Sequence, residues 1–125
     1  MIFLLVDDVE GSLQRLQQII TGLGHSVGGV ARDGLEAVNQ YRKVRPDVVV
    51  LDVIMPRMNG MEALRAIRRF DPRARVVMAS SMRSPETALA SEREGARFFL
   101  YKPIEEAHLR SVIAKLEAEM GQAYP

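Results

Sequence analysis

The sequence predicts an α/β fold in which five β–α units, (βα)5, form a doubly wound, parallel five-stranded sheet. Five short β-like runs recur at similar intervals along the chain, and helical patterns occupy the segments between them. Three of the runs, IFLLV, DVVVL and RVVMA, are almost continuously apolar, which is typical of strands covered on both faces. Because crossover connections between parallel strands are right-handed, the units should wind into one open sheet.

The predicted strands share a short apolar stretch bounded by polar or turn-forming residues. They are Ile2–Val6, Ser26–Ala31, Asp47–Leu51, Arg75–Ala79 and Arg97–Tyr101. The second strand contains Gly28-Gly29, which weakens a strand interior and is easiest to accommodate at a sheet edge.

The helices are predicted from apolar residues that recur every three to four positions. The last helix has the strongest pattern, carried by Leu109, Val112, Ile113, Leu116 and Met120. Similar patterns predict three earlier helices, around Leu13, Leu16, Ile20 and Leu23, around Leu35, Val38 and Tyr41, and around Met61, Leu64 and Ile67. The segment Ser84–Glu94 has a weak apolar stripe and completes the alternation as a fourth helix.

Composition narrows the class of protein. Of 125 residues, 47% are hydrophobic and 26% are charged, as in a globular domain, and the net charge of +1 does not call for nucleic acid or a membrane as partner. The absence of cysteine excludes disulfides and thiolate metal sites. The apolar start is too short for a signal peptide, and no run approaches the roughly 20 apolar residues of a membrane-spanning helix. We expect a cytoplasmic protein with one domain over residues 1–121 and a short tail, 122–125.

Polar residues stand where four of the five predicted strands end. The first strand is followed by Asp7-Asp8, the third by Asp52, the fourth by Ser80-Ser81 and the fifth by Lys102-Pro103. In open α/β sheets, ligands bind at the carboxyl ends of the strands, where the strand order reverses. With the flavodoxin-like order 2-1-3-4-5, the first and third strands are neighbours at that point and the second lies at the edge. The sequence therefore predicts that these side chains share one site.

Three carboxylates in one pocket repel one another, and this favours a cation that prefers oxygen ligands. Mg²⁺ fits because it takes one or two carboxylates, retains water and accepts phosphate oxygens. An aspartate can also act as a covalent nucleophile and form an aspartyl phosphate. The Lys102 ammonium and the Ser80 hydroxyl would then stabilise charge on the transferred phosphoryl group.

Each of these residues has a simpler interpretation when taken alone. Asp7-Asp8 could cap the following helix, Ser80-Ser81 could precede a helix, and Lys102 could belong to a turn. Their joint placement favours the functional interpretation.

Other residues attract attention but favour structural roles. The arginines at positions 65, 68, 69, 73 and 75 are interpreted as a solvated helix face rather than a nucleic-acid site. The methionines at 55, 58 and 61 are expected to pack, and His25 and His108 to lie on the surface.

The motifs LLVDD, LDVIMPRMNG, MASS and GARFFLYKP resemble those of the receiver domains of two-component response regulators, chemotaxis-type single-domain receivers included, over essentially the whole chain. The resemblance implies that Asp52 is the phosphoacceptor. It also implies that Mg²⁺ is held by Asp8 and Asp52 directly, by Asp7 mainly through water, and by the backbone carbonyl of Ile54.

The resemblance further assigns a switch. Ser80 occupies the Ser/Thr switch position, Phe99 the switch aromatic, and Lys102 the phosphoryl-contacting lysine, whose bond to Pro103 is typically cis. The sequence departs from the common pattern because Phe99 lacks a hydroxyl and because Ile54 and Met82 are apolar where polar residues are common, which bears on the lifetime of the phosphoryl group.

The resemblance implies a phosphoacceptor switch in a His-Asp phosphorelay rather than an enzyme with turnover. The phosphodonor would be a sensor histidine kinase or a histidine phosphotransfer protein, the output a protein-binding surface around helix 4, strand 5 and helix 5, and a phosphorylation-dependent dimer is a further expectation. Two alternatives are a Mg²⁺-dependent phosphohydrolase, which commonly has a second acid where Ile54 stands, and a degenerate receiver used only for docking.

Overall fold

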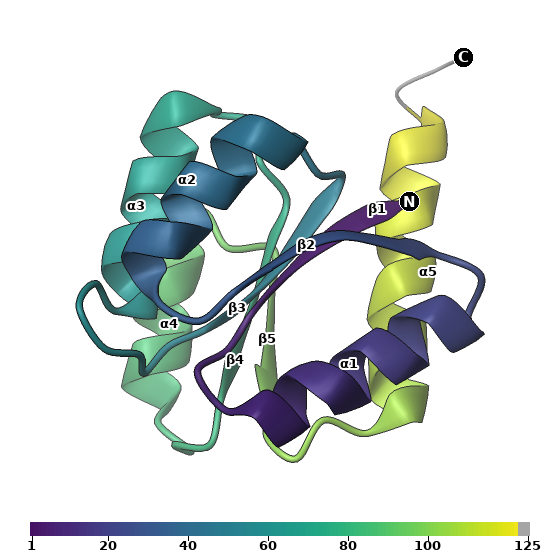
Figure 1. The fold of residues 1–125 in the computed structure, drawn as a ribbon, viewed down its shortest axis with the longest axis horizontal. Coiled ribbons are helices and arrows are strands. Elements are labelled where there is room, and N and C mark those ends of the chain that lie inside the picture. The colour runs from purple at the N-terminus through teal and green to yellow at the C-terminus, as the bar shows by residue number, and fades with distance from the viewer. Residues whose placement is uncertain (123–125) are drawn as a thin grey trace.

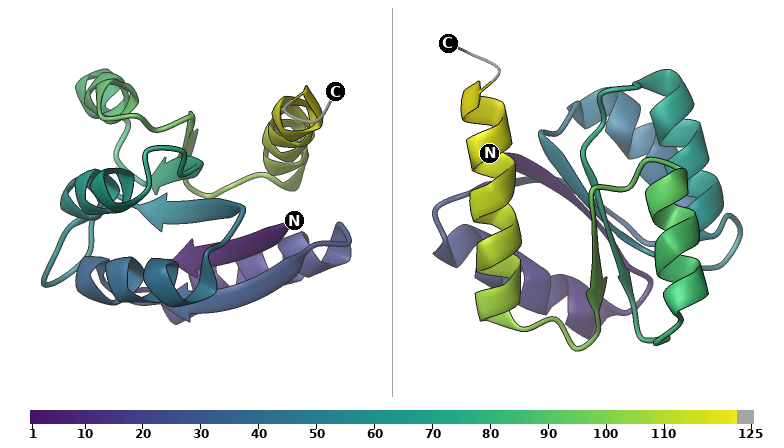
Figure 2. Two further views of the ribbon diagram at one scale, coloured as in Figure 1. Left: turned by 90° about the horizontal axis from the view of Figure 1, so that it is seen from above. Right: turned by 180° about the vertical axis from the view of Figure 1, so that it is seen from behind.

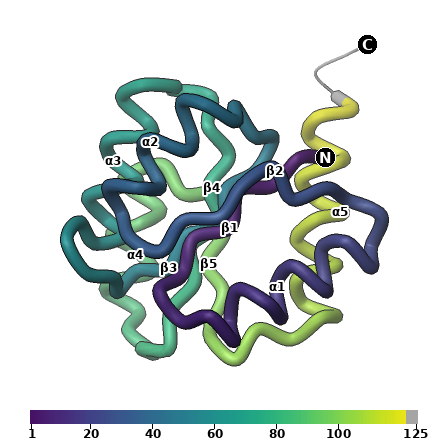
Figure 3. The backbone as a smooth tube through the Cα atoms, viewed as in Figure 1, coloured from purple at the N-terminus to yellow at the C-terminus, as the bar shows by residue number. Residues whose placement is uncertain are grey.

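The five predicted strands form a single parallel sheet in the computed structural model, which describes residues 1–122. Its strands are β1 (Ile2–Val6), β2 (Ser26–Ala31), β3 (Val48–Asp52), β4 (Val76–Ser80) and β5 (Phe98–Tyr101). The order is β2-β1-β3-β4-β5, as predicted, and the chain path that produces it can be followed in Figure 3. The order reverses between β1 and β3, so these two strands lie side by side at the centre of the sheet.

Helices cover both faces of the sheet (Figure 1). They are α1 (Glu10–Gly22), α2 (Gly34–Val44), α3 (Gly60–Phe70), α4 (Pro85–Arg93) and α5 (Glu106–Gln122). The views in Figure 2 show α1 and α5 on one face and α2, α3 and α4 on the other. None of the helices among residues 1–122 is long and apolar enough to cross a bilayer.

Each face of the sheet has its own apolar core, because alternate residues of a buried strand point to opposite sides. Leu4 and Val6 of β1 pack towards α2 and α3, whereas Phe3 and Leu5 pack towards α1 and α5. Met55 is buried in the first core, and Met58 and Met61 pack against it, which confirms their structural role.

Three strands differ from the prediction by one residue: β3 and β4 are each shifted one position along the chain, and β5 begins at Phe98 rather than Arg97. The shifts of β3 and β4 matter for the site. Asp47 precedes β3 rather than opening it, because its carboxylate accepts a hydrogen bond of 2.7 Å from the backbone of Ile2. At the other end, Asp52 is the last residue of β3 and pairs with Ala79, and Ser80 is the last residue of β4. Both side chains are therefore held by the sheet and not by a loop.

Three other expectations are settled by packing. His25 is not a surface residue: its side chain is 12% exposed and bridges the N-terminal amine, at 2.9 Å, and Glu117, at 3.4 Å. His108 is exposed, as expected. Gly28 lies at a bulge in the pairing of β2 with β1, where a Cβ atom would come within 2.7 Å of Ile2 and Val44.

The predicted tail begins at residue 122, whereas α5 continues to Gln122, so the first tail residue belongs to the helix. Positions 123–125 lie outside the described residues.

Replacing Tyr41 with Phe should lower the free energy of unfolding by about 1–2 kcal/mol at neutral pH. The buried Tyr41 hydroxyl donates a 2.7 Å hydrogen bond to Asp71, and this bond is the main reason why the pKa of Asp71 is lowered. A carboxyl whose pKa is lowered by folding stabilises the fold above its ordinary pKa, and this contribution is lost as the pH falls through the lowered value. Urea unfolding from pH 7 downwards should show the wild-type protein and Tyr41→Phe converging in acid; a constant difference would contradict the assignment.

Candidate functional site

The side chains predicted to share a site come together at the carboxyl end of the sheet. Backbone hydrogen bonds continue past the strand ends and set the spacing of these side chains. The N–H of Lys102 donates to the carbonyl of Ser80 at 2.8 Å, and the N–H of Asp7 donates to the carbonyl of Ala31 at 3.0 Å. Asp52 lies between them at the end of β3. Four strands therefore deliver one polar group each to the same edge, as the sequence predicts.

Three carboxylates form the acidic half of the site. Asp7, Asp8 and Asp52 each place a carboxylate oxygen within 4.8 Å of the others. Asp7 and Asp52 are buried, whereas Asp8 is exposed, so the cluster is open to solvent on one side. Asp7 does not cap α1 through its side chain: Oδ1 accepts a 2.9 Å hydrogen bond from the N–H of Val9, and Val9 itself occupies the N-cap position. The capping interpretation is therefore wrong.

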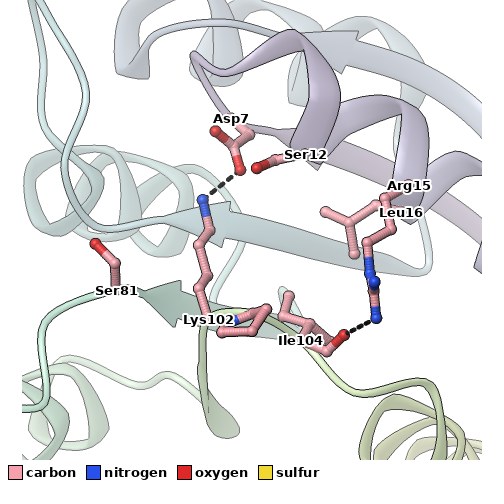
Figure 4. A pocket seen from close by; sticks show the side chains of 8 residues that line it. Asp7, Ser12, Arg15, Leu16, Ser81, Lys102 and Ile104 are labelled. Atoms are coloured by element: carbon pink, nitrogen blue, oxygen red, sulfur yellow. Dashed lines mark hydrogen bonds and ion pairs between the residues drawn. The ribbon is translucent and has the colours of Figure 1, made fainter.

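Lys102 supplies the basic half of the site. Its Nζ atom forms an ion pair with Asp7 (Figure 4). It forms a second ion pair with Asp52, at 3.2 Å. The peptide bond between Lys102 and Pro103 is cis, as the resemblance implies. Three carboxylates and one ammonium group leave a net local charge of two negative units, which matches the charge of one divalent cation.

Burial and charge shift the ionisation of the central pair. The pKa of Asp52 is raised, first by burial and also by repulsion from Asp7 and Asp8, although Lys102 opposes these effects. Burial lowers the pKa of Lys102, but its hydrogen bond to Asp7 and its attraction to Asp52 outweigh this, so the net shift is upward. Lys102 is therefore firmly protonated, and Asp52 is held in a charge-rich site that a cation would relieve.

Ser80 and its loop lie next to the acids. The Ser80 side chain is fully buried, and its Oγ accepts a 3.0 Å hydrogen bond from the N–H of Met82. Ile54 is 52% exposed and Met82 is 43% exposed, so neither side chain is packed into its loop.

Phe99 stands apart from the acidic cluster. It is half-buried on β5, packs against the core on the α2–α3 face and contacts the ring of Tyr101 edge-on at 5.4 Å. Tyr101 pairs with Ser80 in the sheet, and Arg83 lies over its ring at 5.0 Å. Tyr101 thus connects Ser80 to Phe99, a contact that the sequence did not indicate.

A cavity of about 340 Å³ opens beside Lys102, between α1 and the loop after β5 (Figure 4). Its wall includes Arg15, whose guanidinium donates a 2.6 Å hydrogen bond to the carbonyl of Ile104 and so ties α1 to that loop. No local pattern in the sequence singles out Arg15, because its partner lies 89 positions away.

Comparison with protein families identifies this arrangement. Residues 3–114 match the model of the response regulator receiver domain. The chain belongs to this family. Receiver domains act as phosphoacceptors in two-component signalling, and they bind Mg²⁺ through an aspartate cluster of the kind described above.

Relatives and solved structures agree with the assignment. The receiver is 34% identical to the chemotaxis protein CheY of Thermotoga maritima over 90% of this chain and 94% of that protein. It also matches the protein-glutamate methylesterase/protein-glutamine glutaminase of Pyrococcus abyssi with 43% identity. That match covers 80% of this chain but 28% of the longer relative. Among solved structures, the CheX-CheY-BeF3-Mg complex of Borrelia burgdorferi contains a chain with a TM-score of 0.90 and 33% identity, covering 93% of this receiver and 88% of that chain.

Two of the five arginines predicted to form a solvated face, Arg65 and Arg68, make contacts within the receiver. Arg65 forms a 3.1 Å ion pair with Glu94, and Arg68 donates to the carbonyl of Ala74 at 3.2 Å and to that of Pro72. These contacts connect α3 to neighbouring segments and support the structural interpretation.

Proposed function

We propose that this receiver accepts a phosphoryl group on Asp52, with Mg²⁺ held by Asp8, Asp52 and the backbone carbonyl of Ile54, and by Asp7 through water. The observation that carries the proposal is the cluster of three carboxylates around one lysine at the carboxyl edge of the sheet. Its donor set of carboxylate and carbonyl oxygens suits Mg²⁺. Bound Mg²⁺ would supply positive charge to the phosphoryl oxygens.

In the transfer step, a carboxylate oxygen of Asp52 attacks the phosphorus atom of a phosphohistidine. The new bond joins oxygen to phosphorus, the bond from phosphorus to the imidazole nitrogen breaks, and the imidazole leaves with the electron pair. Lys102 contacts the phosphoryl oxygens and partly offsets their charge, while Ser80 can donate its hydroxyl to them.

The phosphoryl group would then bias a two-state surface. Ser80 moves towards the phosphoryl group, and Phe99 turns into the space that it vacates, which changes the face formed by α4, β5 and α5. The phosphodonor is a sensor histidine kinase or a histidine phosphotransfer protein, and the output is binding of a protein partner or of a second copy of the domain. The functional unit is the domain of residues 1–121, acting in the cytoplasm without contacting nucleic acid or a membrane.

The direct test uses acetyl phosphate, a small phosphodonor, with and without Mg²⁺. We expect intact mass spectrometry to detect one added phosphoryl group only when Mg²⁺ is present. The same protein should not turn over p-nitrophenyl phosphate. Sustained hydrolysis of that ester would favour the phosphohydrolase alternative, and absence of the adduct would favour a degenerate docking domain.

The phosphorylated state should decay slowly. Ile54 and Met82 are half exposed beside Asp52 and Ser80, and neither can hydrogen-bond a water molecule that attacks the aspartyl phosphate. The double variant Ile54→Asn with Met82→Glu should therefore lose phosphate faster, by about tenfold, which corresponds to about 1.4 kcal/mol in the barrier.

Decay is followed by intact mass after the phosphodonor is removed. Leu89→Asn, which changes an apolar side chain of similar exposure on α4, serves as control and should decay like the wild-type protein. A decay rate of the double variant equal to that of Leu89→Asn would show that the two side chains do not control access of water.

A further inference from the structure

The loop that follows Asp52 is attached to a second element, the N-terminus of α2. This loop, residues 53–59, contains Ile54, whose carbonyl is proposed as a metal ligand. Its near end is fixed by the sheet, because the N–H of Val53 donates to the carbonyl of Ala79 at 2.9 Å. Its far end contacts Asp33 and Gly34, through Arg57 and Met58 respectively.

Arg57 makes the side-chain part of this attachment. Its Nε and Nη2 atoms donate to the same oxygen of Asp33 at 2.9 and 2.5 Å. Asp33 is buried and is the N-cap residue of α2: its other carboxylate oxygen accepts a 2.8 Å hydrogen bond from the N–H of Glu36. The guanidinium is thus attached to a carboxylate that the helix itself holds in place.

The backbone supports the same attachment. The carbonyl of Met58 accepts a 2.9 Å hydrogen bond from the N–H of Gly34, and a Cβ atom on Gly34 would lie only 2.1 Å from that oxygen. Arg57 has φ 64°, a left-handed conformation that is unfavourable for a residue other than glycine. Such a conformation persists only where the surrounding contacts determine it. Here it directs the Arg57 side chain towards Asp33.

We propose that Arg57 is a positioning residue: by binding Asp33 it holds the 53–59 loop, and with it the Ile54 carbonyl, in the geometry that receives the metal ion. This inference rests on the proposed function. Between the sheet-bound Val53 and Arg57 lie only Ile54, Met55 and Pro56, so displacement at Arg57 is transmitted over a short span. Residues that orient metal ligands commonly affect affinity without touching the metal.

The attachment should matter more for Mg²⁺ binding than for folding. The Arg57 side chain is 63% exposed, and ion pairs with a solvent-exposed partner contribute little to stability. Removing Arg57 also relieves an unfavourable backbone conformation if the replacement tolerates positive φ. A purely structural role for Arg57 would instead lower stability and leave the affinity of the folded protein unchanged.

The test compares Arg57→Asn and Arg57→Gly, which both tolerate the left-handed conformation and cannot reach Asp33, with Arg32→Asn as control. Arg32 is exposed and pairs with Glu10 at 2.8 Å, so this control removes the same charge without releasing the loop. By NMR titration, both Arg57 variants should bind Mg²⁺ about tenfold more weakly than the wild-type protein. Their phosphorylation rate at saturating Mg²⁺ should stay within about twofold of wild type, because the nucleophile itself is unchanged.

A second measurement examines the attachment without metal. Amide hydrogen exchange of Gly34, whose N–H is protected by the Met58 carbonyl, should accelerate in both Arg57 variants and not in Arg32→Asn, while the urea midpoint is equal to or above that of wild type. Unchanged exchange, or equal losses of Mg²⁺ affinity in Arg57→Asn and Arg32→Asn, would overturn the proposal. Failure of the wild-type protein to bind Mg²⁺ or to take a phosphoryl group would instead contradict the proposed function, and unaltered Gly34 exchange would still refute the positioning role by itself.

Discussion

Replacing Asp52 with Asn is expected to abolish Mg²⁺-dependent phosphorylation by acetyl phosphate. The amide that replaces the carboxylate is not a nucleophile, and it removes a buried negative charge from the cluster of carboxylates that we propose binds Mg²⁺. Intact mass should show no adduct under conditions that convert the wild-type protein. A hydroxylamine-labile adduct that persists in Asp52→Asn would show that another carboxylate is the acceptor.

Asp8→Ala provides the matched control for this prediction. It removes an exposed carboxylate of the same cluster and leaves Asp52 in place. We expect it to suppress phosphorylation by weakening metal binding, so raising the Mg²⁺ concentration should restore part of the rate. Asp52→Asn should not respond to Mg²⁺. Phosphorylation of Asp8→Ala at the wild-type rate would contradict the assignment of Asp8 as a ligand.

Asp52→Asn should also stabilise the fold in the absence of metal, by about 1–2 kcal/mol, within the usual range for one residue. Burial raises the pKa of Asp52, so the folded state holds its proton more tightly than the unfolded state does. Such a group costs stability as the pH rises through and above its ordinary pKa, and the cost disappears in acid. The advantage of Asp52→Asn in urea unfolding should therefore be present at neutral pH and vanish below about pH 4. A stability advantage that is independent of pH would show that charge is not its cause.

Lys102→Ala should produce the largest loss of stability, about 3 kcal/mol in metal-free buffer. Lys102 is the ion-pair partner of two buried carboxylates, Asp7 and Asp52, and removing one member of a buried ion pair leaves the other charges uncompensated. Urea unfolding in the presence of EDTA measures this loss. Lys43→Ala, which removes an exposed lysine on α2, should change stability by less than about 0.5 kcal/mol.

Mg²⁺ should narrow the difference between Lys102→Ala and the wild-type protein, because the cation replaces part of the missing positive charge. The variant should also retain some phosphorylation on Asp52 but lose the increase in partner affinity that phosphorylation causes. An equal loss of stability with and without Mg²⁺ would contradict a shared site for the lysine and the metal. A normal increase in partner affinity would contradict the relay role of Lys102.

The sequence alone determined the sheet and the composition of its polar edge. Short β-like runs identified all five strands, and three of these runs are almost continuously apolar because a strand covered on both faces must be apolar along its length. Parallel strands end at the same edge, so the positions of Asp7, Asp52, Ser80 and Lys102 in the sequence are enough to place them together. The bounds of β3 and β4 and the start of β5 were each misplaced by one residue, because pairing with the neighbouring strand and not local composition decides where a strand starts and stops.

The tertiary structure decided the contacts that connect distant segments. Arg15 with Ile104, His25 with Glu117, and Arg57 with Asp33 each join residues that carry no mutual pattern in the sequence. A hydrophobic period reports which face of a helix or strand is buried, but it contains no information on which polar side chain a long arginine will reach across a loop. That choice depends on the packing of whole elements, on close approaches such as that of Gly34 to Met58, and on the backbone conformation of single residues such as Arg57.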